Sequence, residues 1–301
     1  MNQNHIRTDL AMEAKEALTH TPYENEGIQV EEFSDKDTHI KKTIVRILTE
    51  NAATSIGKPR GTYVTLESPQ MNEEDEGHHA EISKSLARCL GDFCKIPTSH
   101  QHPVSILVVG LGNRNITPDS LGPNVVDQLC ISRHLFREFG QSAFEEPSAY
   151  LLSGIVPGVM GQTGMESLEI VKGVVTACNP SLCIIIDALA ARSIKRLNRT
   201  IQISDTGIHP GSGVGNHRNC LSEETLGIPV LSLGIPTVVD AATIVSDSLS
   251  EISDEDLDIS PLLLPSLHSM FVTPKDIDAS IRRLSYTLSE GINKAFGPHL
   301  A

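Results

Sequence analysis

Two uninterrupted apolar runs constrain the fold of this chain more than any other feature of its sequence. One is Ser105–Val109 in the stretch SILVVGLGNRN, and the other is Leu182–Ile186 in the stretch SLCIIIDALAAR. Apolar runs of this kind, without polar alternation, are typical of strands that are buried on both faces of a parallel sheet. Because helical patterns alternate with strand patterns along the chain, we expect a three-layer α/β/α sandwich, with helices on both faces of a mostly parallel, mixed sheet.

Hydrophobic periodicity and turn residues predict the other elements. Strands are expected over five further segments: Thr43–Leu48, Gly61–Leu66, Ala149–Ser153, Thr200–Ser204 and Val230–Gly234. Helices are expected over residues 10–20, Ala80–Phe93, Pro123–Phe136, a segment from a capping box of Thr163 and Glu166 to Val175, Val238–Leu249, and a last helix after Thr273 with an apolar face of Ile277, Ile281, Leu284, Leu288, Ile292 and Phe296. Residues 21–40 are expected to be irregular. No linker or repeat divides the core, so the sequence predicts a single domain.

Composition excludes several classes of function. The 301 residues carry a formal charge of −14, from 24 basic and 38 acidic side chains, which argues against a nucleic-acid partner. The six cysteines form no Cys-x-x-Cys pair, which argues against a structural zinc site. Because no apolar run reaches the length of a membrane span and the N-terminus lacks a signal-peptide core, we expect a cytoplasmic protein without a membrane partner.

Three acidic residues follow predicted strands, in the place where open α/β sheets bind ligands. Asp119 lies in the loop after the first apolar run, Asp187 comes directly after the second run, and Asp205 follows the strand that ends at Ser204. Structural roles remain open, because Asp119 can cap a helix and Asp187 can cap the next turn or pair with Arg192. A carboxylate directly after LCIII is nevertheless costly to desolvate unless it is paired, hydrogen-bonded or functional.

Two carboxylates that lie together can share a proton. One of them then activates a water molecule, and the other hydrogen-bonds a scissile carbonyl, which is a complete peptidase mechanism without a metal. With His209 added, Asp119 and Asp187 would instead make a plausible site for a divalent metal. The structural alternative for His209 is a loop histidine that a backbone carbonyl orients.

The stretch SDTGIHPGSGVGNHR carries two motifs whose usual chemistry is not expected here. Its Asp-Thr-Gly begins at Asp205, but pepsin-like proteases are β-rich and bring two such tripeptides together. Gly211 and Gly213 lack the spacing of G-x-G-x-x-G, and no Gly-Lys-Ser or Gly-Lys-Thr is present, so a phosphate loop is not expected either. The loop, with Asp205 and His209, is expected to shape a cleft or bind substrate backbone, and its glycines to permit positive φ.

Seven blocks spread over nearly the whole chain carry a family resemblance: IRTDLAMEA, GLGNRNITPDSLGP, RHLF, PGVMGQTGMES, IDALAARSIKRLNRTIQISDTGIHPGSGVGN, LGIPVLSLGIPTVVDA and MFVTPKDID. They resemble the germination protease (spore protease) family of endospore-forming bacteria, which are atypical aspartic endopeptidases. The resemblance implies that Asp119 and Asp187 are the essential aspartates and that no cofactor is needed. It also implies a fold similar to that of hydrogenase-maturation endopeptidases, whose corresponding acidic positions bind nickel. A metal-dependent, maturation-type endopeptidase that uses these two aspartates and His209 is therefore the alternative.

The family's members are homotetrameric zymogens that remove their own N-terminal propeptide. For this chain the resemblance implies a propeptide of residues 1–9, self-cleavage between Asp9 and Leu10, and one peptidase domain over residues 10–301. The segment around this bond, with Glu13 further on, is similar to the family's substrate site. The implied substrates are the small acid-soluble spore proteins that coat DNA, cut at germination, so the implied location is the forespore cytoplasm or spore core. The chain departs from the family at residues 250–269, where a surface insertion is shortened.

Overall fold

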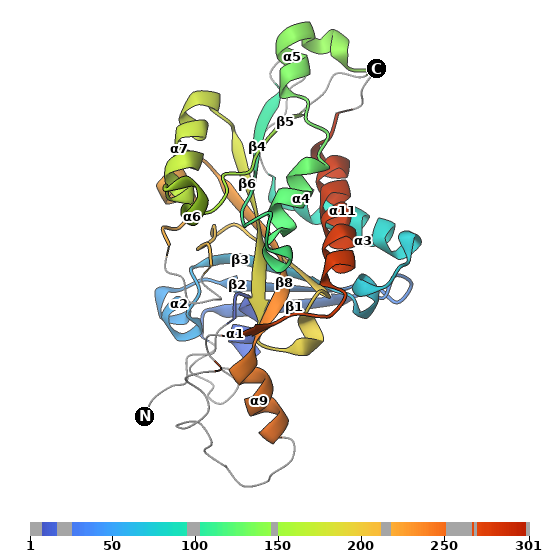
Figure 1. Cartoon of the computed structure of the whole chain (residues 1–301), viewed down its shortest axis with the longest axis vertical. Helices are drawn as coiled ribbons and strands as arrows, with labels where there is room; N and C mark the ends of the chain where they lie inside the picture. The colour runs from blue at the N-terminus through green and yellow to red at the C-terminus, as the bar shows by residue number, and fades with distance from the viewer. Residues whose placement is uncertain are drawn as a thin grey trace.

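The computed structural model describes residues 8–16, 26–94, 103–145, 150–211, 218–250, 267 and 270–298. Within these ranges the strands form one nine-stranded sheet in the order β1-β2-β3-β7-β8-β6-β4-β5, with β9 paired to β8 (Figure 1). The strands are β1 (Ile28–Ser34), β2 (Lys41–Ile47), β3 (Gly61–Glu67), β4 (Val104–Gly110), β5 (Tyr150–Ile155), β6 (Leu182–Ala191), β7 (Thr200–Ser204), β8 (Val230–Asp240) and β9 (Phe271–Val272). The helices are α1 (Ala11–Glu16), α2 (Glu50–Ile56), α3 (Glu76–Phe93), α4 (Leu121–Asp127), α5 (Arg133–Phe139), α6 (Met160–Thr163), α7 (Ser167–Cys178), α8 (Glu223–Leu226), α9 (Ala241–Ser250) and α11 (Ile277–Phe296), with 3-10 turns η2 (Pro69–Asn72), η3 (Thr117–Asp119), η4 (Gly140–Ala143) and η5 (Ile194–Arg196).

Strand β4 shows how helices cover both faces of the sheet. Its Ile106 and Val108 pack in a core cluster with residues of α3, α4 and α11. Its Leu107 and Val109 pack in a second cluster with residues of α7. Successive residues of a strand point to opposite faces, so an apolar run without alternation fills both cores at once. The expected three-layer α/β arrangement is confirmed.

The sheet is mixed, and its parallel part contains both apolar runs. Strands β5, β4, β6 and β8 pair in parallel, whereas β1, β2, β3 and β7 pair antiparallel and β7 runs antiparallel to β8. Strand β6 pairs with β4 only as far as Ile186, but its ladder with β8 continues to Ala191. The predicted strand end at Ile186 is therefore wrong, because β8 supplies hydrogen-bonding partners beyond the apolar run. Asp187 lies inside β6.

Helix α11 packs along the α3 side of the sheet, as Figure 1 shows in red. The six apolar residues that define its predicted face are all buried. Gly291 allows the close approach of α3, since a Cβ there would lie 2.5 Å from Leu86 Cδ2. The predicted amphipathic helix is confirmed.

Two predicted segments fold differently. Residues 21–40 are not irregular throughout, because β1 lies within them; it is an outer strand whose residues after Ile28 are exposed, so it has no apolar face to reveal it. The helix predicted over Pro123–Phe136 is two helices, α4 and α5. Ser132 separates them: its N–H donates to the Leu152 carbonyl of β5 at 3.0 Å, and its Oγ accepts from the Leu152 N–H at 3.0 Å.

Two helices begin at other residues than the sequence predicted. The capping box of α7 is made by Glu166 and Glu169, whereas Thr163 ends α6. Helix α9 begins at Ala241 because β8 continues to Asp240.

Most of the predicted insertion at 250–269 lies outside the described residues. Among the helices that the structure describes, none is both long and apolar enough to cross a membrane.

Candidate active site

Asp187 is a buried carboxyl group inside β6. Because the preceding Ile186 packs on the α3 and α11 side, the Asp187 side chain lies on the opposite face. Its Oδ1 accepts a hydrogen bond from the Ala188 N–H at 2.9 Å. Burial raises the pKa of Asp187 well above its usual value, and the nearby carboxylates of Asp119 and Asp9 raise it further. Both effects favour the protonated form of Asp187.

Asp119 ends the loop that follows β4, as the last residue of η3. Its Oδ2 accepts from the Asn113 N–H at 2.8 Å, and the Thr237 hydroxyl of β8 donates to the Pro118 carbonyl at 2.7 Å. Gly112 has a φ of 109°, and a Cβ there would lie 1.9 Å from the Asp119 carbonyl oxygen. The loop can close in this way only on a glycine. Burial raises the pKa of Asp119, and the hydrogen bond from Asn113 opposes that shift.

Asp119 and Asp187 line one cleft of about 370 Å³. Arg218 lines the same cleft, and its positive charge lowers the pKa of both carboxyl groups against the larger effect of burial. The structure thus brings together the two aspartates singled out in the sequence. The apolar lining residues include Leu111, Ile116, Val159, Val238 and Phe271.

The N-terminal segment of the chain enters this cleft at Asp9. The Asp9 N–H donates to the Ala190 carbonyl at 2.9 Å, and the Ala190 N–H donates to Asp9 Oδ2 at 2.8 Å. Ala190 lies on β6, beyond the last residue that pairs with β4. The Asp9 side of the predicted cleavage bond is therefore tied to the strand that carries Asp187.

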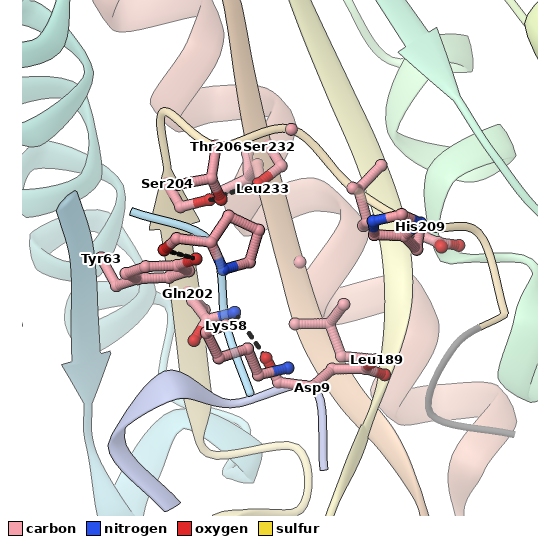
Figure 2. Close-up of a pocket in the computed structure, with 15 residues that line it drawn as sticks. Asp9, Lys58, Tyr63, Leu189, Gln202, Ser204, Thr206, His209, Ser232 and Leu233 are labelled. Atoms are coloured by element: carbon pink, nitrogen blue, oxygen red, sulfur yellow. Dashed lines mark hydrogen bonds between the residues drawn. The ribbon is translucent and has the colours of Figure 1, made fainter. Parts of the chain in front are cut away.

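The residues on either side of Asp9 also make defined contacts. Leu10 is fully buried in a cluster that includes Leu189 of β6, and Lys58 Nζ donates to the Thr8 carbonyl at 2.9 Å. Figure 2 shows Lys58 and Asp9 close together on one side of a pocket. Burial lowers the pKa of Lys58, while Asp9 and Glu13 favour its charged form.

Glu13 anchors the other end of the same segment. Only 2% of this residue is exposed, and its carboxylate accepts hydrogen bonds from the Arg192 N–H at 2.7 Å and the Ser193 N–H at 2.9 Å. Arg196 Nη1 lies 3.4 Å from Glu13 Oε1, and the Thr8 hydroxyl donates to the same carboxylate. Because a buried carboxylate with this many donors is well compensated, the segment has a defined position.

The glycine-rich stretch forms part of the wall. His209 lines a smaller pocket of about 70 Å³ that also reaches Asp187, and it lies apart from Lys58 and Asp9 in Figure 2. Gly211 lines the larger cleft, with a φ of 71°. Gly213 lies outside the described residues.

Asp205 does not lie at the edge predicted for it. Strand β7 is antiparallel to β8, and in register Gln202, not Asp205, is level with Gly234 and Asp187. Asp205 is three residues further, roughly 10 Å along the strand. Its Oδ1 accepts from the Thr62 N–H at 2.8 Å and so holds the start of β3. The prediction is wrong because it took β7 to run parallel to its neighbours.

The metal-dependent alternative needs several ligand side chains close together. Among the described residues, which include Asp119, Asp187 and His209, no three side chains of His, Cys, Asp or Glu come together as metal ligands.

Sequence reasoning missed Lys58, Gln202 and Arg218. Gln202 carries a readable signal, because Gln202 and Ser204 alternate with apolar residues in TIQIS and β8 repeats the pattern with Ser232. Polar positions on one face of a central strand indicate a ligand or a buried network. Lys58 and Arg218 lie in loops and carry no such pattern.

Comparisons with known proteins agree over most of the chain. A family model described as germination protease matches residues 6–255. Germination proteases of Clostridium tetani and Priestia megaterium are 42% and 40% identical to this chain; both matches cover 98% of it, and they cover 96% and 94% of the relatives. Among solved structures, a [NiFe] hydrogenase maturation protease, HycI, from Thermococcus kodakarensis covers 68% of this chain and 99% of its own, at 17% identity and a TM-score of 0.34. That likeness is too distant to bear on the chemistry.

The family match spans most of the chain, and the relatives match it over nearly their whole length. Peptidase activity in spore germination is what this family is named for. The chain belongs to the germination protease family.

Proposed function

We propose that this protein is a spore-germination endopeptidase in which Asp119 and Asp187 hydrolyse peptide bonds as an acid–base pair. The observation that carries the proposal is the N-terminal segment: Asp9 is hydrogen-bonded to β6 in the cleft that both aspartates line. A peptide held beside two carboxyl groups, Asp187 buried and Asp119 half-buried, is the geometry that such a pair needs.

The unequal surroundings of the two carboxyl groups assign their roles. Asp187 is the more deeply buried group and has its pKa raised by Asp119 as well as by burial, so it holds the shared proton and hydrogen-bonds the scissile carbonyl. Asp119 is ionised and takes a proton from water as the water oxygen bonds to the carbonyl carbon. The Asp187 proton then passes to the leaving nitrogen as the C–N bond breaks. The products are a carboxyl group and an amine, and the pair again holds one proton.

The first bond cut, in this proposal, is Asp9–Leu10. Cleavage would divide the chain into a propeptide of residues 1–9 and a peptidase domain of residues 10–301. Leu10 is fully buried, so it occupies the space that the residue after the cut would take in any other substrate. The unprocessed chain is accordingly a zymogen, because its own segment fills the site.

The substrates we propose are the small acid-soluble proteins of the spore, and the location is the spore core. Support comes from the resemblance and from the segment itself, in which an acidic residue, an apolar residue and alanine span the predicted cleavage site at Asp9–Ala11. Main-chain groups of β6 bind this segment in two ways. The Ala190 carbonyl accepts from the Asp9 N–H, as it could from any extended peptide, and the Ala190 N–H donates to the Asp9 carboxylate.

A cleavage assay tests the proposal. Purified chain is incubated with a small acid-soluble spore protein, and cut sites are read by mass spectrometry. We expect cleavage after acidic residues, loss of cleavage in Asp119→Asn and Asp187→Asn, and normal cleavage in Asp205→Asn, whose amide oxygen can still accept from Thr62. Inactivation by chelator with recovery on adding nickel or zinc would contradict the proposal in favour of the metal-dependent alternative.

We also carry the homotetramer forward as a proposal. Strand β1 is the outermost strand, and its Val30 and Phe33 are exposed, so it offers a surface on which copies can pair. Light scattering on the purified chain should give four times the monomer mass of 32.6 kDa. A monomeric mass at micromolar concentration would contradict the assembly and leave the aspartate pair untouched.

A further inference from the structure

Gln202 is a buried amide that binds both sides of the predicted cleavage bond. It lies on β7 and is 8% exposed. Its Nε2 donates to the Asp9 carbonyl at 3.0 Å, and its Oε1 accepts from the Ala11 N–H at 2.7 Å. The orientation of the amide follows from its partners, since a carbonyl can only accept and an N–H can only donate.

The register of the sheet places Gln202 opposite Asp187. Gly234 of β8 pairs with Gln202 on one side and with Asp187 on the other. Residues level with one another in neighbouring strands share a face, so both side chains rise on either side of Gly234. A Cβ on Gly234 would lie 2.6 Å from Leu189 Cγ, so this position has no room for a side chain between them.

The carbonyl that Gln202 binds is the one that water would attack. When the water oxygen adds to the Asp9 carbonyl carbon, the carbonyl oxygen becomes an oxyanion. An N–H donor already 3.0 Å from that oxygen strengthens its hydrogen bond as charge develops. The bond from Ala11 to Oε1 keeps the amide from rotating and fixes the residue after Leu10 at the same time.

We propose that Gln202 is a catalytic residue: its Nε2–H stabilises the oxyanion at the scissile carbonyl, and its Oε1 aligns the peptide on the leaving-group side. This inference rests on the proposed cleavage at Asp9–Leu10. Any extended substrate would meet the same amide, because Gln202 binds only main-chain atoms. Gln202 thus supplies the scissile carbonyl with a second hydrogen-bond donor, in addition to the protonated Asp187.

The first-order rate of self-processing, followed by intact mass, tests the inference, because the segment is already bound and the rate reports the chemical step. Gln202→Glu keeps an acceptor for Ala11 but replaces the donor with an oxygen. We expect this variant to process about 100- to 1,000-fold more slowly than wild type. The matched control is Gln128→Glu, the same change at an exposed amide outside the cleft, whose Nε2 donates to the Asn124 carbonyl at 2.9 Å; its rate should match wild type within about twofold.

Hydrogen exchange separates catalysis from simple anchoring. It is measured over residues 8–16 in Asp187→Asn with and without Gln202→Glu, where neither chain is expected to process. Slow processing with unchanged protection of the segment supports the catalytic role. A normal processing rate in Gln202→Glu overturns it, as does a slow rate matched by equal loss of protection. Failure of wild type to process is a different result, which overturns the proposed function as well.

Discussion

The most informative single residue is Asp187, a carboxyl group placed where apolar side chains would be expected. It continues the apolar run of β6, is 6% exposed, and accepts a hydrogen bond from the Ala188 N–H. A group so placed is costly to ionise, and the cost appears as a raised pKa. The sequence alone predicted this desolvation cost, because Asp187 directly follows LCIII. It could not predict that the strand continues, because the partner strand β8 decides that.

Replacing Asp187 should therefore change how stability depends on pH. The folded pKa of Asp187 lies above the unfolded value, so the folded state binds the proton more tightly and loses stability as pH rises from about 4 towards 7. Asparagine cannot ionise. In an Asp119→Asn background, where processing is not expected, Asp187→Asn should have a higher free energy of unfolding at pH 7 and a smaller advantage near pH 4.

Urea denaturation at both pH values measures this difference. As a control, Leu288→Ala in the same background removes a fully buried, non-titrating side chain of α11. It should lower the free energy of unfolding by about 2–5 kcal/mol at both pH values. An advantage of Asp187→Asn that grows as the pH falls would show that Asp187 is not destabilised by ionisation.

We expect Lys58 to position the N-terminal segment for self-processing, without taking part in proton transfer by the two aspartates. Its Nζ donates to the Thr8 carbonyl, next to the predicted cleavage bond. Lys58→Met keeps the length of the side chain and removes the charged donor, so self-processing should slow by about tenfold or more. Lys84→Met, at an exposed pair with Glu81, should process at the wild-type rate. Equal rates for both variants would show that Lys58 does not position the segment.

At the scale of elements, the sequence predicted seven of the nine strands that the structure describes, and it missed β1 and β9. The runs around Ile184 and Val108 were visible because both their faces are buried. Strand β1 was not visible, because almost all of it is exposed. The polar face made by Gln202, Ser204 and Ser232 was present in the sequence as alternation, but it has meaning only once β7 and β8 lie side by side.

The loop of Asp119 gives an element-scale prediction. Gly112→Ala would place a Cβ within 1.9 Å of the Asp119 carbonyl oxygen at a φ of 109°, so the loop must move and carry the carboxylate with it. A displacement of about 1 Å can cost about 100-fold in rate, and we expect a loss of that order in cleavage. Gly164→Ala has a similar left-handed φ of 71° but nothing within 4 Å, so it should lose about 1 kcal/mol of stability and keep its rate. Equal activity of both variants would contradict the account of this loop.

At the scale of the whole molecule, the candidate site joins the two halves of the mixed sheet. The parallel half supplies Asp187 on β6 and the Asp119 loop after β4. The antiparallel half supplies Gln202, and Lys58 reaches the segment from the loop between α2 and β3. The aspartates could be predicted because motifs carry them. Lys58 and Arg218 could not be predicted, because they lie in loops without a sequence pattern. The place of Gln202 level with Asp187 depends on β7 running antiparallel to β8, which also moves Asp205 away.

The N-terminal segment is the feature that unites this account, because it links zymogen, substrate and aspartate pair. Thr8–Glu16 is bound along β6 and η5 through Asp9, Glu13 and Arg196. These bonds hold the segment in position for the chemistry that we propose for the cleft.

Intact-mass analysis of the purified chain over time tests this claim most directly. Wild type and the control Asp205→Asn should lose residues 1–9 unaided, leaving a chain that begins at Leu10. Asp119→Asn and Asp187→Asn should keep their full mass, and a cooperative urea unfolding transition of each variant shows that it is folded. Loss of residues 1–9 from either purified aspartate variant without help would contradict the account.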